Sequence, residues 1–460
     1  MVDFKYHAAA RKALEIARRS GGRLPSERSL CDICGVSRIT AKKALNSLSQ
    51  RGVVTRHVGK GTFLAEGKTA PKLSFLMVAP NTSAEMQTYF RREAELFLGS
   101  RNCRQIDFVA IGDENVVSHI QGHGTKIVCW PYVGRLSNLG VLSNFNELPE
   151  FAEVCDHIDL SLCDWHRSLE GAKQCSAIPL CFSVNTFGFN RRFAQKLGLD
   201  AETGPRNWEE IREWGERCAR DSSIHPTGGH HPKRGLPFSY YLTASGGIEY
   251  LEETPAGLKF NFAAGAKWFD LFRRLYTLPN VCVMPTPGPD PLTRNRALFS
   301  CEVGPWVMHH QGTRLGDDLV TQPIPPAAPG GIFCPHIGKY CAGIVPGGDA
   351  DGVALAWAFI KHLLCDADAQ RRLLTTNHII AANKTVRDEQ AARPEWKIFI
   401  DAFHAGKALS SHPVMFGLTA LLKESFTDCV TGRIEPEEAA AKVQEFGNLL
   451  IKIERERTWF

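Results

Sequence analysis

Residues 24–63 constrain the fold more than any other part of the 460-residue chain. Ser26, which follows a proline, favours a helix over 27–34, because its side chain can accept hydrogen bonds from free backbone N–H groups. Gly35 ends that helix, and Ser37 can cap a second one. Apolar residues recur at helical spacing on one face of the second helix: Ala41, Ala44, Leu45 and Leu48. The sequence therefore predicts two helices separated by a short turn.

The opposite face of the second helix is polar and basic, and a hairpin follows it. This outer face carries Arg38, Thr40, Lys42, Lys43 and Asn46, and Gly52 closes the helix. Residues 53–58 and 62–65 have the pattern of two strands, joined by a tight turn at Gly59-Lys60-Gly61. Two such helices followed by a hairpin predict a winged helix-turn-helix, whose second helix reads the major groove of DNA.

Charge is concentrated in the same segment. Residues 1–66 hold 13 Lys and Arg against 5 Asp and Glu, a net charge of +8, whereas the whole chain carries +5 and the remainder therefore −3. A compact basic module on a mildly acidic body is suited to binding the phosphate backbone of DNA.

The motifs of this segment closely resemble the GntR family of bacterial transcription regulators over about residues 5–65. They are Leu24-Pro25-Ser26-Glu27-Arg28, Gly35-Val36-Ser37-Arg38, Ala44-Leu45, Gly52 and Gly59-Lys60-Gly61-Thr62-Phe63. The resemblance implies DNA contacts from Arg28, Arg38, Thr40, Lys42 and Gly59, and we add Ser37, Lys43 and Lys60 to the expected DNA-binding set. Ile39 stands where many members have Thr, and Lys42 where many have Arg, which alters the expected base preference because Lys lacks the bidentate fork of Arg.

Composition predicts an ordinary globular protein with more than one core, since 43% of the residues are hydrophobic and 22% charged. No run of 18 apolar residues occurs, and a charged helix begins close to Met1, so we expect a cytoplasmic protein with no membrane association. The fifteen cysteines show no regular framework and are expected to pack as small apolar residues. This includes the Cys31 and Cys34 pair, which has no second pair at zinc spacing, and we expect no metal and no cofactor.

A polar linker at 67–72 precedes a larger α/β region at 73–460. Strands are expected at 73–79, 105–111 and 126–130, with a helix at about 85–100 between the first two. Strands that alternate with helices indicate an α/β architecture with crossover helices.

Further segments in this region resemble, in order and spacing, the family 1 extracellular solute-binding proteins of ABC transporters, which include maltose-binding proteins. The segments are 178–180, 186–191, 197–200, 207–210, 297–299, 304–306, the helix 354–364 and the helix start at 432–439. The resemblance implies two α/β lobes joined by a hinge, with ligand bound between them. Lobe one would take about 73–180 and 338–390, and lobe two about 183–335 and 395–460.

Aromatic and polar residues at the matching places form the expected ligand-binding set, because sugars present apolar faces ringed by hydroxyls. Trp130 and Tyr132 follow the third strand, where a parallel sheet opens its ligand crevice. Ser183 and Asn185 lie at the expected first hinge crossing. The remaining candidates are Tyr240, Tyr241, Trp306 and Phe416.

A solute-binding fold behind a DNA-binding domain predicts a sensor that responds to its ligand. We expect a homodimer that binds double-stranded operator DNA and a small molecule, most simply a carbohydrate, and that is not an enzyme. Amino sugars, polyols and glycosides fit as ligands equally well. The alternatives are a pyridoxal-phosphate aminotransferase-like domain, whose Asn-Pro and Ser-x-x-Lys motifs we do not find, a hydrolase, and a DNA-binding protein with a non-functional cleft.

Overall fold

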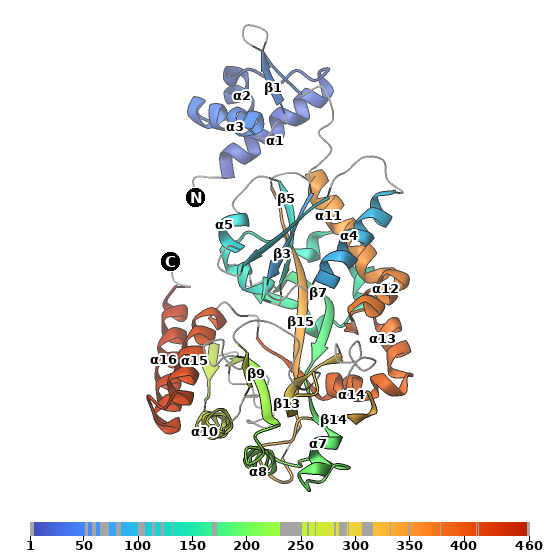
Figure 1. Cartoon of the computed structure of the whole chain (residues 1–460). Coiled ribbons are helices and arrows are strands. Elements are labelled where there is room, and N and C mark those ends of the chain that lie inside the picture. The colour runs from blue at the N-terminus through green and yellow to red at the C-terminus, as the bar shows by residue number, and fades with distance from the viewer. Residues whose placement is uncertain are drawn as a thin grey trace. The chain divides into compact units, whose positions relative to one another are not determined.

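The computed structural model of the chain shows two sheet-based lobes and a small N-terminal domain (Figure 1). The structure describes residues 4–50, 54–57, 61–64, 73–79, 84–99, 106–112, 116–120, 124–130, 132–167, 173–230, 251–254, 257–262, 264–279, 282–284, 292, 294–305, 316–331, 333–347, 350–377, 379–410, 412 and 414–457.

The N-terminal domain has three helices and one hairpin: α1 (Phe4–Arg19), α2 (Glu27–Cys34), α3 (Arg38–Gln50), β1 (Val54–His57) and β2 (Gly61–Leu64). The expected apolar face of α3 is buried, and it packs with alanines of α1 and with Leu30 of α2. Cys31 and Cys34 pack against this core as free thiols. The predicted helix over 27–34 and the hairpin that follows α3 are both confirmed.

The sheet of lobe one has eight strands. Six of them run in the order β16-β7-β15-β5-β3-β4, while β17 also pairs with β15 and β6 with β7. The bounds are β3 (Leu73–Ala79), β4 (Ile106–Gly112), β5 (Thr125–Trp130), β6 (Asp164–Arg167), β7 (Lys173–Val184), β15 (His336–Val345), β16 (Ile380–Ala381) and β17 (Lys407–Ala408). The three predicted strands at the start of this lobe are thus present, each within one residue of its expected bounds.

Helices pack on this sheet through aromatic side chains. Phe75 of β3 lies 4.9 Å, between ring centroids, from Phe90 of α4 (Ala84–Gly99). It lies 6.0 Å from Phe359 of α11 (Ala350–Cys365). Both helices therefore cover the same face of β3.

The other helices of the lobe are α5 (Val116–Ile120), α6 (Phe151–His157), α12 (Ala367–Asn377), α13 (Lys384–Ala391) and α14 (Lys397–Ala405), with the 3₁₀ turns η2 (Val133–Leu139), η3 (Phe145–Glu147), η4 (Leu160–Leu162) and η9 (Pro394–Trp396).

The chain leaves this sheet at Asn185, the single residue between β7 and β8 (Thr186–Asn190). Strand β8 belongs to a second sheet of five strands, ordered β12-β9-β13-β8-β14. Its other strands are β9 (His225–His230), β12 (Cys282–Met284), β13 (Ala297–Val303) and β14 (Leu319–Gln322), preceded by η8 (Gly316–Asp318). The chain returns to the first sheet between β14 and β15, so it passes between the two sheets more than once.

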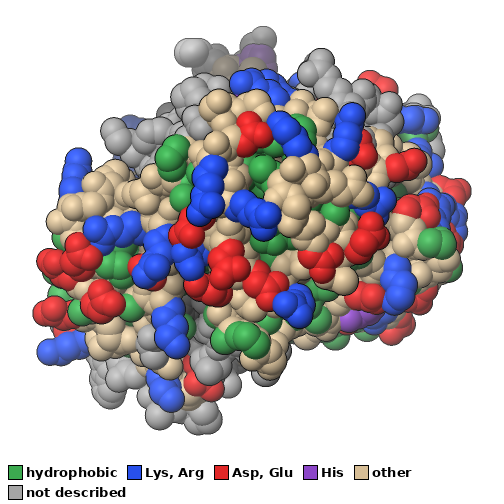
Figure 2. Space-filling model, turned by 60° about the horizontal axis from the view of Figure 1, so that its bottom comes forward, with side chains coloured by type: hydrophobic (Ala, Val, Ile, Leu, Met, Phe, Trp, Pro, Cys, Tyr) green, Lys and Arg blue, Asp and Glu red, His purple; other side chains and the backbone are tan. Residues whose placement is uncertain are grey.

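Lobe two has its own apolar core, formed between the second sheet and its helices. The helices are α7 (Arg191–Lys196), α8 (Trp208–Cys218), α10 (Gly265–Tyr276), α15 (Met415–Val430) and α16 (Pro436–Arg457), and a small hairpin of β10 (Leu251–Thr254) and β11 (Gly257–Phe260) packs with them. Aromatic rings dominate this core, for example Trp268 of α10 against Phe426 of α15 at 5.5 Å. The face that carries α7 and α8 is a mixture of acidic and basic side chains (Figure 2).

One expected segment boundary differs from the structure. Residues 395–460 were assigned to lobe two, but α14 packs on β7 and β17 pairs with β15, so the chain remains with the first sheet through Ala408. The two-residue strand β17 is too short to leave a pattern in the sequence.

The cysteines that the structure describes are free thiols, and most of them are buried. Among the described helices, none combines the length and apolar character needed to span a bilayer.

A candidate DNA interface and a candidate ligand site

Side-chain caps define the turn between α2 and α3. The Ser26 hydroxyl accepts a hydrogen bond from the backbone N–H of Ser29 at 3.1 Å, which fixes the first turn of α2. Gly35 ends α2 with φ +61°, a left-handed conformation that glycine adopts without a steric penalty. The Ser37 hydroxyl accepts from the N–H of Thr40 at 3.2 Å and so caps α3. These caps set the geometry in which α3 follows α2.

The outer face of α3 is exposed and basic. Arg28, Ser37, Arg38, Lys42 and Lys43 are all exposed, and 86% of the Arg38 side chain is accessible. Thr40 is half-buried, and its hydroxyl lies 2.9 Å from that of Ser37. Ile39 is 81% exposed, which is unusual for a large apolar residue unless it contacts something. Gly59 and Lys60 of the expected set lie outside the described residues.

Glu27 links this face to the hairpin. Its carboxylate lies 3.9 Å from Nε of Arg38 and 4.0 Å from Nη2 of Arg56 on β1. Exposed pairs of this kind contribute little to stability, about 0–1 kcal/mol, so their effect here is to orient two cations on one surface. The approach of Glu27 and Arg56 could not be predicted from sequence, because it depends on how β1 lies relative to α2.

The hairpin is attached to the segment before α2. The N–H of Leu24 donates to the carbonyl of Thr62 at 2.8 Å, and the N–H of Leu64 donates to that of Gly22 at 2.6 Å. The Arg23 guanidinium also lies over the Phe63 ring, 5.8 Å from its centroid. Strand β2 is therefore held between β1 and residues 22–24, which keeps the hairpin beside the helices.

Trp130 and Tyr132, the first two ligand-binding candidates, contact each other at the end of β5. Their ring centroids lie 5.5 Å apart in an edge-to-face arrangement. Trp130 is 3% exposed, whereas Tyr132 is half-buried. Trp130 thus supports the ring of Tyr132 from the core, and Tyr132 is the member of the pair that retains accessible surface.

A buried ion pair anchors the turn that follows Tyr132. Asp164 of β6 accepts hydrogen bonds from the N–H of Gly134, at 3.1 Å, and from Nζ of Lys339 on β15. The side chains of Lys339 and Asp164 are only 9% and 1% exposed. A Cβ atom at residue 134 would come within 2.4 Å of the Asp164 carboxylate, so this close approach requires glycine.

The neighbouring carboxylate keeps Lys339 charged although its side chain is buried. Burial opposes the charge of Lys339, but the adjacent Asp164 outweighs it and raises the pKa of Lys339 to about 12. The same turn is held a second time, because the Ser137 hydroxyl lies 2.6 Å from that of Ser176 on β7. The segment that carries Tyr132 is therefore fixed by polar contacts to β6 and β7. The ion pair between Asp164 and Lys339 could not be predicted from sequence, since 175 residues separate its members.

Ser183 and Asn185 lie at the end of β7, where the chain leaves the first sheet. Ser183 is exposed and stands opposite Gly338 of β15. A Cβ atom at residue 338 would lie 2.4 Å from the Ser183 hydroxyl, so glycine there leaves room for that side chain. Asn185 is half-buried. Tyr240, Tyr241 and Trp306 lie outside the described residues, and Phe416 is placed in α15 without a described side chain.

Residues 14–64 match the family model described as bacterial regulatory proteins, gntR family. An HTH-type transcriptional regulator of Mycobacterium tuberculosis is 48% identical over 61 residues, which are 13% of this chain and 23% of that protein. The HTH-type transcriptional regulator GgaR of Escherichia coli K12 is 55% identical over 42 residues, 9% of this chain and 17% of its own length. The chain thus spans less than a quarter of these relatives, and the likeness is confined to the N-terminal domain.

Solved structures of binding proteins match the larger part of the chain. The GacH receptor of Streptomyces glaucescens, solved unliganded and with acarbose, has a TM-score of 0.65 at 15% identity, over 83% of this chain and 99% of that one. A solute-binding protein of Thermotoga lettingae, bound with alpha-D-tagatose, has the same TM-score, identity and coverage. The chain therefore joins an N-terminal winged helix-turn-helix of the gntR family to a two-lobed α/β region with the fold of ABC-transporter solute-binding proteins.

Proposed function

We propose that this protein is a transcriptional regulator that senses a small molecule, most simply a carbohydrate, in its two-lobed domain. The observation that carries the proposal is the fusion itself. A basic, exposed α3 of a gntR-family domain is suited to DNA, while the rest of the chain has the fold of binding proteins that were solved with acarbose and with alpha-D-tagatose.

The DNA-binding part of the proposal rests on Arg28, Arg38, Thr40, Lys42 and Lys43. Arg38 is the most direct candidate for base contact, because it begins α3 and its guanidinium can bind guanine through two hydrogen bonds. Arg28, Lys43 and the wing residues Gly59 and Lys60 would contact phosphates, which adds affinity without base preference. Ser37 positions the helix through its cap and offers its hydroxyl at the same surface.

The ligand-binding part rests on Tyr132, supported by Trp130, and on Ser183 and Asn185. An aromatic ring held by a rigid turn provides an apolar surface for a sugar face, and exposed polar side chains can bind the hydroxyls. Tyr240, Tyr241, Trp306 and Phe416 remain proposed members of the site on the resemblance alone. The fold observed after the N-terminal domain is that of binding proteins, which argues against the aminotransferase-like alternative.

Thermal unfolding of the full chain against a panel of mono- and oligosaccharides tests the sensing role. A ligand that binds only the folded state raises the midpoint of unfolding, by an amount that grows with its concentration. We expect one class of sugar to do so and Tyr132→Ala to abolish the shift. The matched control is Tyr276→Ala, another half-buried tyrosine, which packs on Phe426 in the core of lobe two and should keep the shift.

Two results would contradict this assignment. A shift that survives Tyr132→Ala would remove this residue from the site. No shift with any sugar would favour another ligand class or a DNA-binding protein with a non-functional cleft.

A further inference from the structure

Helix α16 exposes a strip of large apolar side chains. Phe446 is 46% exposed, Leu449 48% and Ile453 42%. Six other large apolar residues are similarly exposed among the described residues, and each of those lies alone on its element. Scattered exposed apolar residues are normal on a protein surface, whereas three on one helix call for a partner.

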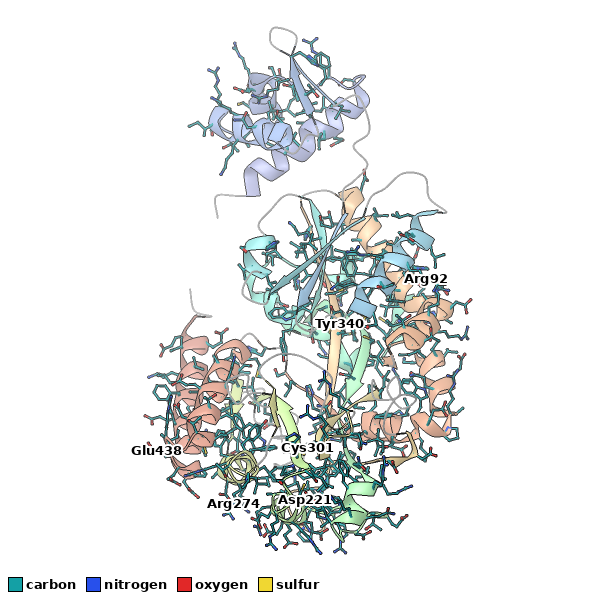
Figure 3. All side chains as sticks on the ribbon, viewed as in Figure 1. Arg92, Asp221, Arg274, Cys301, Tyr340 and Glu438 are labelled. Atoms are coloured by element: carbon teal, nitrogen blue, oxygen red, sulfur yellow. The ribbon has the colours of Figure 1, made fainter. Side chains whose placement is uncertain are left out.

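The orientation of α16 is fixed by its buried side. The helix packs against α10 and α15 through Ala439, Val443 and Ile451. Gly447 approaches the Phe260 ring so closely that a Cβ atom there would lie 2.2 Å from it. The helix cannot rotate to bury the strip, which therefore faces outward. Figure 3 labels Glu438 in the first turn of this helix.

The three residues form one continuous strip. Their spacing of three and four positions places them on the same helical face, over a length of about 10 Å. Glu445 and Lys452 are exposed along one border of the strip. Glu456 follows the strip by one turn on the same face, whereas Lys442, one turn before the strip, pairs with Glu424 of α15 at 3.0 Å.

When a two-fold axis relates two copies of α16, the charges of one copy meet opposite charges of the other. If two copies of α16 pack antiparallel with Leu449 at the axis, a residue seven positions before it meets the residue seven positions after it in the second copy. Glu445, four positions before, lies beside Lys452, three positions after. Parallel packing would instead place each charge against its own equivalent.

We propose that α16 is the homodimer interface of this protein, formed by antiparallel packing of two copies about Leu449. The apolar strip supplies the centre of the interface, where fully desolvated side chains contribute most of the affinity. The border formed by Glu445 and Lys452 supplies opposite charges in reversed order, as an isologous contact requires. A different protein as partner would have no reason to match this symmetry.

The proposal rests on the proposed function in one respect, because a regulator that binds two half-sites needs two DNA-binding domains. Its test is separate, since it measures mass and not sugar binding. Light scattering after size-exclusion chromatography of the full chain should give twice the 50.9 kDa of one chain. Leu449→Glu should give the mass of one chain, with an unchanged circular dichroism spectrum.

Leu96→Glu is the matched control. Leu96 is 50% exposed on α4, so the same substitution at equal exposure should leave the dimer intact. A monomeric wild-type protein, or a dimer that persists in Leu449→Glu, would overturn the proposal. Either result would leave the sugar-binding test unaffected.

Charge reversal tests the antiparallel register. Glu445→Lys and Lys452→Glu should each weaken the dimer about tenfold, because two attractive exposed pairs become repulsive. The double variant should recover wild-type affinity, and the two single variants, when mixed, should form a heterodimer. Failure of both recoveries would overturn the proposed register.

Discussion

At the residue scale, the candidate DNA contacts are separable from the fold because their side chains point away from the core. Arg38 is held near Glu27 only by a long ion pair and is 86% exposed. Substitutions at such positions change stability by about 0.5 kcal/mol or less. Effects on DNA binding there can therefore be read directly as lost contacts.

Arg38→Ala should weaken binding to a selected operator duplex by about 1–3 kcal/mol, roughly 5- to 150-fold, while non-specific binding falls far less. Fluorescence anisotropy with specific and scrambled duplexes measures both. Lys12→Ala removes the same charge from α1, where Lys12 pairs with Glu15, and serves as the control. Retained specificity in Arg38→Ala would refute the assignment of α3 as the reading helix.

Ile39 offers a second test at the same helix end. An exposed apolar residue in the major groove can contact the methyl group of thymine, the one apolar feature of a base edge. Replacing the contacted thymine by uracil removes only that methyl and should cost about 0.8 kcal/mol, roughly fourfold in affinity. The Ile39→Ala variant should bind both duplexes equally. If no replacement of thymine by uracil changed the affinity of the wild-type protein, Ile39 would not contact a thymine methyl group.

His336 makes stability depend on pH. Burial, and secondarily the charge of Lys339, lowers the pKa of His336 to about 4, against about 6.5 in an unfolded chain. Between these values the unfolded state binds the proton more readily, so this contribution to stability is present above about pH 6.5 and lost as the pH falls towards 4. The free energy of unfolding, measured with urea at several pH values, should depend less on pH in His336→Asn than in the wild type. His404→Asn, on the exposed side of α14, should match the wild type.

Among the helices and strands, those whose ends are set by a single capping or turn residue could be predicted from sequence. Helix α2 begins after Ser26 and ends at Gly35 as predicted, since both signals are side-chain or backbone properties of single residues. Strand β7 was not predicted, because twelve residues with an almost continuous buried run show no alternation. The Asp164–Lys339 pair and the turn it holds depend on strand pairing, which sequence patterns do not reveal.

The turn 133–139 should loosen when its anchor is cut. Asp164→Asn leaves Lys339 buried without its counter-charge, and breaking a buried pair in this way costs about 3–5 kcal/mol. Denaturant unfolding measures the loss, and Asp164→Asn combined with Lys339→Met should recover part of it. If Asp164→Asn alone were as stable as the wild type, the ion pair would not contribute to stability.

At the scale of the whole molecule, the two proposed functions belong to separate domains. The first 66 residues carry a net charge of +8 and the rest of the chain −3, so DNA affinity should fall steeply with salt while sugar affinity does not. The sequence was sufficient to predict both folds, because each carries motifs of its own. It was not sufficient to predict where the chain passes last from one sheet to the other, since β17 has only two residues.

If DNA binding and sugar binding are coupled, the affinity for DNA must differ with and without the sugar. The dissociation constant of the full chain for a selected duplex is measured alone and then with each sugar that raises the unfolding midpoint. We expect a change of about 5–150-fold with that sugar, the same factor in sugar affinity when DNA is added, and no change in Tyr132→Ala. Equal DNA affinity with and without a sugar that demonstrably binds would contradict this coupling.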